Sequence, residues 1–186
     1  MNFDNSTNVV SYCPTELALT SGFRTEVIEL DKASIVFRPF QPGDRRTVFQ
    51  LLSILPSLYP NGSSWLKRRL DDVLAGKARC TVAVSQWGIV GTTIETPKGL
   101  HRIKLSTIFV HPYFRGLNIG TRLLDRCRAD WLRGDIDRVY VTSDLRRVGV
   151  LLPVLTRFGF RTEAIELGRY GSERDEIILS WNGNKL

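Results

Sequence analysis

The stretch "HPYFRGLNIGTRLL", residues 111–124, joins a segment of strand-like alternation to a segment of helical periodicity. Gly116 and Gly120 let the main chain approach a bound group closely, and Arg115 adds a positive charge. Asn118 stands where a middle glycine is expected, but asparagine tolerates a positive φ and is a favoured N-cap residue. Because a helix start offers free N–H groups, the stretch predicts a loop that holds a phosphate. The alternative is a helix start that carries arginine and glycine and binds nothing.

The helix that follows this loop is predicted over residues 118–133. Apolar residues recur there at a spacing of four, at Ile119, Leu123, Cys127 and Trp131. Before the loop, alternation of apolar and polar residues predicts strands at 80–85, 87–95 and 102–110. The turn between the first two of these strands is very short, which predicts a hairpin.

The remaining elements extend this pattern on both sides. Toward the N-terminus we expect a strand at 34–40, a helix at 44–55 that Pro56 and Pro60 end, and a helix at 64–74 with Lys67, Arg68 and Arg69 exposed. Toward the C-terminus we expect a strand at 138–142, a helical stretch at 146–158 that Pro153 kinks or shortens, and strands at 160–167 and 175–181. This alternation of strands and helices predicts the α/β class.

Length and composition favour a single globular domain. The chain has 186 residues and 42% hydrophobic content, enough for one well-buried core and short for two. It has no apolar run of about eighteen residues, so we expect no membrane-spanning segment. Cys13, Cys80 and Cys127 are widely spaced, and the two histidines give no metal-ligand spacing. We therefore expect a cytoplasmic protein without a metal, whose thiols are small core residues.

The charge balance is strongly basic. The net charge is +7, and arginine carries most of it. Such a balance favours an anionic partner: a nucleic acid, a phosphorylated cofactor or an acidic surface. A solvated basic face explains the same charge, and composition does not separate these alternatives.

A near-repeat crosses this layout. The segment "GFRTEVIEL" at 22–30 returns as "GFRTEAIEL" at 159–167, with Val27 against Ala164 as the one difference. If both copies prefer the same pairing, the first is a strand that adds to a sheet edge of its own chain or of a second subunit, which leaves a homodimer open. The alternative is a tail without a partner. We divide the chain into an N-terminal extension, residues 1–33, and a domain, residues 34–186.

Several motifs together resemble one known family. In the GCN5-related N-acetyltransferase (GNAT) superfamily, the signature [Q/R]-x-x-G-x-[G/A] lies between a strand and a helix. Here it falls on Arg115, Asn118 and Gly120, and only the central position departs from it. "FGF" at 158–160 and "FRPFQPGD" at 37–44 also match family segments, so the resemblance covers roughly residues 34–181. It implies an α/β fold with a central mixed, largely antiparallel sheet of about seven strands, flanked by about four helices.

The resemblance also implies a reaction and a cosubstrate. The reaction is transfer of an acetyl group from acetyl-CoA to a primary amine by direct attack. The fourth and fifth strands splay, and the pantetheine arm bonds to the main chain of Ile108, Phe109 and Val110. An N–H group near Phe109 or Val110 stabilises the oxyanion. The pyrophosphate is held by the N–H groups of Arg115, Gly116, Leu117, Asn118, Ile119, Gly120 and Thr121.

The groups for proton transfer follow less directly. The tyrosine that the family often uses as general acid falls on Leu155 here. A thiolate is a tolerable leaving group without such an acid. The candidate catalytic bases are Glu95 and Asp144, with His111 as a further choice. The alternatives are an exposed turn acid for Glu95, a helix cap for Asp144 and a loop residue for His111.

Two other functions stay open. The missing tyrosine and central glycine are compatible with a catalytically degenerate protein that binds acyl-CoA or a partner. The small size and the basic charge are compatible with a nucleic-acid-directed member, such as a toxin that acetylates aminoacyl-tRNA or a base-modifying enzyme. The acceptor amine is a small molecule or a macromolecule, and the sequence does not name it.

Overall fold

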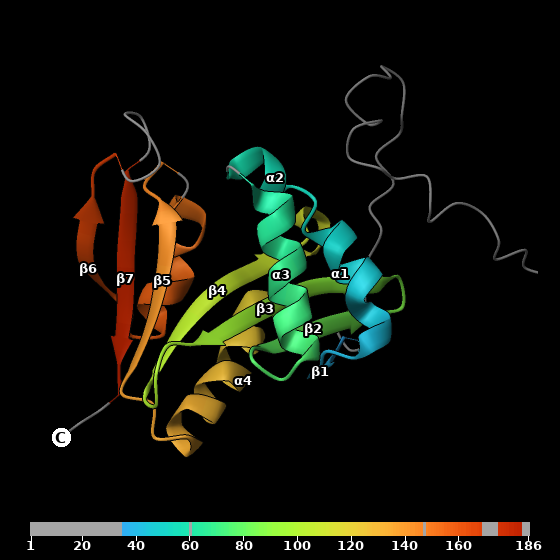
Figure 1. Ribbon diagram of the computed structural model, residues 1–186, viewed down its shortest axis with the longest axis horizontal. Coiled ribbons are helices and arrows are strands. Elements are labelled where there is room, and N and C mark those ends of the chain that lie inside the picture. The colour runs from blue at the N-terminus through green and yellow to red at the C-terminus, as the bar shows by residue number, and fades with distance from the viewer. Residues whose placement is uncertain (1–34, 60, 147, 169–174, 184–186) are drawn as a thin grey trace, which may run out of the picture. The chain divides into compact units, whose positions relative to one another are not determined.

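A seven-stranded sheet organises the domain (Figure 1). The computed structural model describes residues 35–59, 61–146, 148–168 and 175–183. The strand order is β1-β2-β3-β4-β5-β7-β6, and neighbouring strands are antiparallel except β4 and β5, which are parallel. The predicted mixed, largely antiparallel sheet is therefore confirmed. The strands are β1 (Val36–Pro39), β2 (Arg79–Ser85), β3 (Gly88–Pro97), β4 (Arg102–Val110), β5 (Arg138–Asp144), β6 (Arg161–Glu166) and β7 (Glu176–Asn182).

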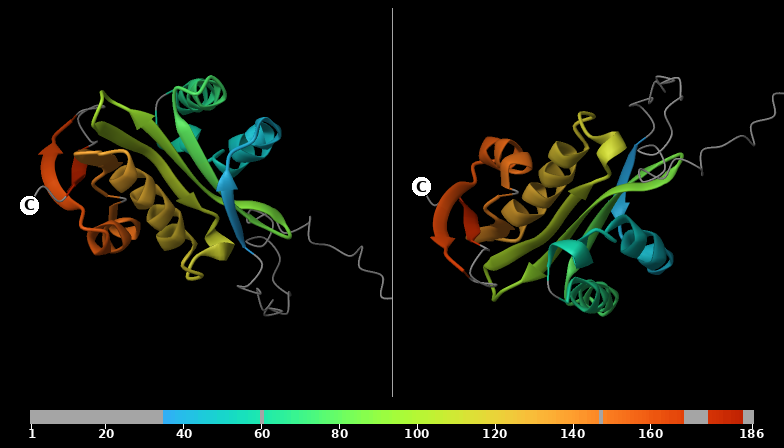
Figure 2. Two further views of the ribbon diagram at one scale, coloured as in Figure 1. Left: turned by 90° about the horizontal axis from the view of Figure 1, so that it is seen from below. Right: turned by 90° about the horizontal axis from the view of Figure 1, so that it is seen from above.

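Helices cover the sheet on both faces (Figure 2). On one face, α1 and α3 pack against β2 and β3, and on the other α4 and α5 pack against β4, β5 and β7. We call these the α3 face and the α4 face. α4 is the crossover between β4 and β5, the kind of connection that parallel strands need. The α-helices of the described residues are α1 (Arg45–Leu51), α2 (Leu55–Leu58), α3 (Gly62–Leu74), α4 (Ile119–Arg133) and α5 (Leu152–Arg157).

The predicted apolar row of α4 is buried in the core and belongs to two of its clusters. Ile119, Leu123, Cys127 and Trp131 are each at most 2% exposed. Burying such a side chain contributes about 1.5–3 kcal/mol, so this row fixes how α4 lies on the sheet. Cys80 and Cys127 are free and buried, as predicted, and burial raises the pKa of both thiols, that of Cys80 to about 11.

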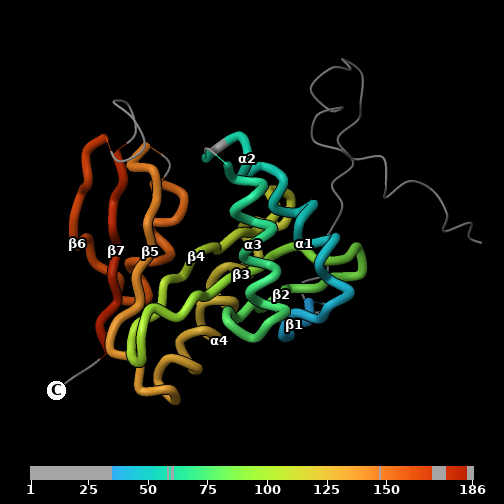
Figure 3. The backbone as a smooth tube through the Cα atoms, in the orientation of Figure 1, coloured from blue at the N-terminus to red at the C-terminus, as the bar shows by residue number. Residues whose placement is uncertain are grey.

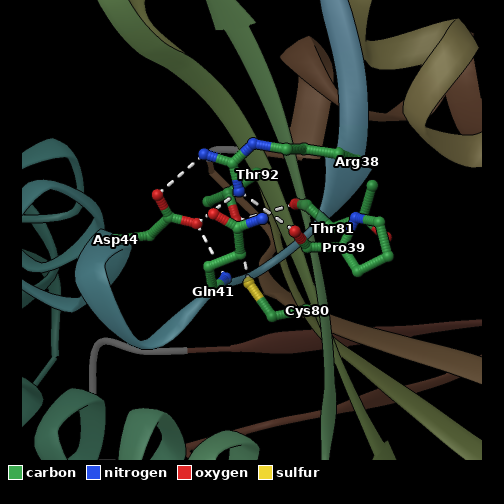
Figure 4. Close-up of polar contacts among 7 residues, drawn as sticks. All are labelled: Arg38, Pro39, Gln41, Asp44, Cys80, Thr81 and Thr92. Atoms are coloured by element: carbon green, nitrogen blue, oxygen red, sulfur yellow. Dashed lines mark hydrogen bonds and ion pairs between the residues drawn. The ribbon is translucent and has the colours of Figure 1, made fainter.

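The connection from β1 to α1 is held by one ion pair (Figure 4). Arg38 donates two hydrogen bonds to the carboxylate of Asp44, at 2.6 and 2.8 Å. The same carboxylate accepts the main-chain N–H of Gln41 at 2.8 Å, which caps the short helical turn Pro42–Asp44. Hydrogen bonding to Arg38 lowers the pKa of Asp44. The motif "FRPFQPGD" is therefore a structural joint.

One proline prediction was wrong, and another holds in part. The helix predicted over 44–55 ends at Leu51, and Pro56 lies in the first turn of α2. The stretch predicted over 146–158 is shortened, as one alternative expected: a short 3-10 turn at Val148–Val150 precedes α5, and Pro153 lies in the first turn of α5 without a kink. Proline has no N–H to donate, and the first turn of a helix needs none, so both positions suit it. Arg69, predicted as exposed, is half-buried and paired with Asp72.

The near-repeat is described in only one of its copies. The second copy forms β6, the last strand in the sheet order, which pairs with β7 alone. The first copy, residues 22–30, and the extension 1–33 lie outside the described residues. Among the helices of the described ranges, none is long and apolar enough to cross a membrane.

Candidate functional site

The strands β4 and β5 pair over only three residues and then separate (Figures 1 and 3). The last pair is Lys104 with Tyr140; beyond it, the rest of β4, Leu105–Val110, pairs with β3 alone. β5 continues alongside β7 as far as Asp144. In an antiparallel ladder every second residue directs its N–H and C=O away from the partner strand. Some N–H and C=O groups of β4 beyond Lys104 therefore point into the β4–β5 separation, where no strand pairs with them.

A β-bulge lies where the separation begins. Leu105 pairs with Glu95, whereas Thr107 pairs with Ile94, so Ser106 is the extra residue. The bulge reverses the alternation of the side chains on β4. Ser106 bonds to Thr96, which contacts Arg69 of α3, whereas Ile108 packs against the core under α4.

The predicted phosphate-holding loop, residues 115–121, which we call the anion loop, has the backbone that such a loop requires. Asn118 adopts φ 60° and ψ 17° and precedes α4, and Gly116 adopts φ 80°. The first helical bond of α4 from the loop side is from Arg122 N–H to the carbonyl of Asn118. Within the described chain, the N–H groups of residues 116–121 have no hydrogen-bond acceptor. With the positive end of the α4 dipole, they give the end of β4 the donors that an anion would require.

The side chains around this loop leave its main chain accessible. Ile119 is buried in the core, whereas Gly116 and Asn118 are exposed, and Leu117, Gly120 and Thr121 are half-buried. Arg115 is exposed and donates from Nε to the carbonyl of Val110 at 3.3 Å, which ties the loop to the end of β4. Ile108, Phe109 and Val110 are all half-buried.

Glu95 lies on the α4 face, away from solvent. It is 2% exposed, and its carboxylate accepts a hydrogen bond from the indole N–H of Trp131 at 2.5 Å. Arg79 approaches the same oxygen at 3.6 Å. Burial raises the pKa of Glu95, and Arg79 and Trp131 oppose this rise. Trp131 stands in the last turn of α4, so Glu95 lies at the opposite end of this helix from the anion loop.

Asp144 and His111 stand near the two open ends of the separated strands. Asp144 ends β5, is 8% exposed, and accepts hydrogen bonds from the N–H and the guanidinium of Arg146. It thus organises the turn after β5. His111 follows β4, and its Nδ1 is buried without a partner among the residues that the structure describes. Burial and the charge of Arg115 lower the pKa of His111, which favours the neutral ring.

Leu155, at the position of the family's tyrosine, is a core residue. It is fully buried on α5 and packs in the cluster that includes Leu124, Phe158 and Leu179. A leucine side chain has no hydroxyl, so residue 155 cannot serve as a proton donor.

A match to a family model over most of the chain decides the family. The model of the acetyltransferase (GNAT) family matches residues 31–160. The chain belongs to the GNAT acetyltransferase family. The separated strands and the bulge described above lie within the matched residues. No curated protein matches the sequence.

Solved structures share the fold at low identity. A GNAT-family protein from Desulfovibrio desulfuricans is similar with a TM-score of 0.71 and 19% identity, over 80% of this chain and 99% of its own. Ard1 from Thermoplasma volcanium has a TM-score of 0.68 and 15% identity, with coverages of 80% and 97%. A GNAT acetyltransferase from Elizabethkingia anophelis, which has acetyl-CoA bound, has a TM-score of 0.63 and 17% identity, with coverages of 81% and 99%. These likenesses show the shared GNAT fold.

Sequence reasoning missed two features of the site. Neither the bulge at Ser106 nor the bond from Trp131 to Glu95 is signalled by local residues. Glu95 and Trp131 are 36 positions apart, so only the docking of α4 brings them together. Glu95 in "TIET" (residues 93–96) was a weak signal of such a bond. An acidic side chain in a strand that is covered on both faces needs a buried partner.

Proposed function

We propose that this GNAT protein transfers an acetyl group from acetyl-CoA to a primary amine. The observation that carries the proposal is the β4–β5 separation, which ends beside the free N–H groups of residues 116–121. A long ligand with an anionic end fits this arrangement, because one part can bond to a strand edge and the other to a helix start. The acetyl-CoA held by the GNAT acetyltransferase from Elizabethkingia anophelis supports the choice of cosubstrate.

In this proposal the two ends of acetyl-CoA bind to different parts of the site. The pyrophosphate lies against the N–H groups of residues 116–121, with Arg115 as a charged neighbour. The pantetheine arm lies along the free edge of β4, where Ile108, Phe109 and Val110 alternately present their main-chain groups. The arm thus replaces the strand partner that β4 lacks beyond Lys104.

The chemistry is a direct transfer. The amine nitrogen attacks the thioester carbon, and the carbonyl electron pair moves to oxygen, where an N–H group near Phe109 or Val110 stabilises the charge. The C–S bond then breaks, and the carbonyl re-forms as an amide. The nitrogen loses a proton, and the leaving thiolate takes one from solvent, because Leu155 stands where the family's acid would be. Positioning supplies most of the rate enhancement.

For the proton acceptor we propose Glu95 and Asp144 as the residues to test. Glu95 lies under Trp131, and Asp144 is engaged by Arg146, so each holds a structural bond as well. A base is recognised by its effect on the rate at low pH, where the carboxylate gains its proton. The pH–rate profiles of Glu95→Gln and Asp144→Asn therefore separate a base from a structural acid.

An acceptor screen tests the proposed function. Acetyl-CoA labelled in the acetyl group is incubated with the protein and with pooled primary amines, polyamines and aminoacyl-tRNA. We expect acetyl transfer to one class of acceptor, together with release of free CoA. Saturable binding of acetyl-CoA without transfer would instead favour a degenerate acyl-CoA-binding protein. Transfer to aminoacyl-tRNA alone would identify a nucleic-acid-directed enzyme.

A further inference from the structure

Thr107 carries a buried hydroxyl that nothing in the described structure uses. The residue is 8% exposed, and its Oγ1 is buried without a hydrogen-bond partner among the described side chains and main chain. An unpartnered buried hydroxyl is costly, because it has given up water and gained no bond in return. Buried polar groups of native proteins are nearly all bonded, so Thr107, one of the few exceptions among the described residues, marks a candidate contact for a ligand.

The position of Thr107 is at the start of the β4–β5 separation. It lies next to the bulge residue Ser106, three residues beyond Lys104, the last residue of β4 that pairs with β5. Ser106 is not comparable, since its hydroxyl already bonds to Thr96 at 2.9 Å and to the carbonyl of Lys104 at 3.4 Å. Of these two adjacent hydroxyls of β4, that of Thr107 is therefore the one with free capacity.

The side chain of Thr107 belongs to the α3 face. Its partner across the ladder is Ile94, which packs in the core under α1 and α3, and opposed residues of an antiparallel pair share a face. Phe109, two residues further, packs against the same core. The anion loop leads into α4 on the opposite face of the sheet (Figure 2). Two substrates that meet at the separation can therefore approach from opposite faces.

We propose that the Thr107 hydroxyl binds the acceptor amine on the α3 face and directs its lone pair at the thioester carbon. The assignment rests on the proposed acetyl transfer and excludes Glu95 as the base for this amine, because Glu95 is buried on the opposite, α4 face. The hydroxyl oxygen accepts one N–H of the neutral amine, and the lone pair of the nitrogen is left for attack. Because Oγ1 is closed to solvent in the free protein, the proposal requires a turn about χ1 that exchanges it with the methyl group. The proposed substrate is thus a primary amine that binds in its uncharged form and donates a hydrogen bond to Thr107.

The test exploits opposite effects on stability and on activity. Thr107→Val keeps the shape of the side chain and removes only the hydroxyl. Because that hydroxyl has no partner in the free protein, we expect the melting temperature to rise, by about 2 to 4 °C. For the best amine of the acceptor screen, we expect kcat/KM to fall about 3- to 10-fold, the value of one neutral hydrogen bond. The affinity for CoA should stay unchanged.

Thr92→Val is the matched control. Thr92 is fully buried on β3, and its hydroxyl donates to the carbonyl of Thr81 at 3.0 Å and contacts Cys80 (Figure 4). Its loss should lower the melting temperature and leave kcat/KM for the amine as it is. Unchanged kinetics in Thr107→Val, or a fall in melting temperature equal to that of Thr92→Val, would overturn the assignment.

Failure of the proposed function has a different signature. If the wild-type protein acetylates no amine, the transfer reaction itself is lost, and the assignment of Thr107 is overturned with it. If the wild-type protein is active and Thr107→Val loses CoA affinity instead, acetyl transfer stands but the hydroxyl binds the cosubstrate, and the amine assignment fails.

Discussion

A substitution of Gly120 separates the stability of the anion loop from its ligand. Gly120 is the second residue of α4, and a Cβ built there meets only the Val110 side chain, at 3.7 Å, an ordinary contact. Alanine is favoured over glycine within a helix by roughly 0.5–1 kcal/mol. The Gly120→Ala protein should therefore melt about 1 to 4 °C higher than the wild type.

The same carbon should weaken CoA binding. It lies next to the side chain of Val110, the last residue of β4, on the helix turn whose N–H groups are free. Losing one charge-assisted hydrogen bond to phosphate costs about 1.5–3 kcal/mol, which raises the dissociation constant roughly 10- to 100-fold. The larger side chain in Gly120→Val should remove most of the affinity.

Calorimetric titration of CoA and thermal denaturation measure the two effects. Gly43→Ala is the control, because a Cβ at Gly43 meets nothing within 4 Å and the residue lies in the turn before α1. It should bind CoA like the wild type. If Gly120→Ala and Gly120→Val also bind CoA like the wild type, the phosphates do not lie at this helix start and the reasoning fails.

Three further predictions concern a buried acid, a core residue and the extension. Burial raises the pKa of Glu95 in the folded protein. The protonated form therefore contributes stability at a pH below the ordinary pKa of glutamate, and this stability is lost as the pH rises through the raised pKa. Glu95→Gln keeps an acceptor for Trp131 and never ionises, so its advantage in melting temperature over the wild type should grow from pH 4 to pH 8; a constant difference would contradict this. Leu155→Ala should cost about 2–5 kcal/mol in urea unfolding and leave CoA affinity intact, and loss of turnover in a folded, CoA-binding Leu155→Ala protein would place Leu155 in the chemistry. Deletion of residues 1–32 should lower the melting temperature or change the mass in light scattering if 22–30 pairs with a sheet edge, and no change in either would leave it as a tail.

The helices and strands with one buried face could be predicted, because burial of one face gives a regular spacing of apolar residues in the sequence. The buried row from Ile119 to Trp131 on α4 shows such a spacing, and so do the two strands of the β2–β3 hairpin. The positive φ of Asn118 was also predictable, since few residues accept it. The prolines were ambiguous, because Pro56 suits both the end of one helix and the first turn of the next.

The candidate site could be predicted only where it is local. The anion loop is one continuous stretch, so the local sequence predicts it. The separation of β4 from β5 depends on how far two strands run side by side, and the hydroxyl of Thr107 stands out only once its neighbours are known. Glu95 was singled out as a carboxylate, but its burial under Trp131 is set by the packing of α4.

The central claim is that acetyl-CoA binds with its pyrophosphate at the start of α4 and its pantetheine arm along β4. The most direct measurement is a titration of the ¹⁵N-labelled protein with CoA, followed through the amide resonances. The account predicts saturable shifts of the amides of residues 116–121 and of those in 108–110 that face the β4–β5 separation, with small changes in α1 and α3. Saturation that leaves the amides of 116–121 unmoved, or no binding of CoA at all, would contradict it.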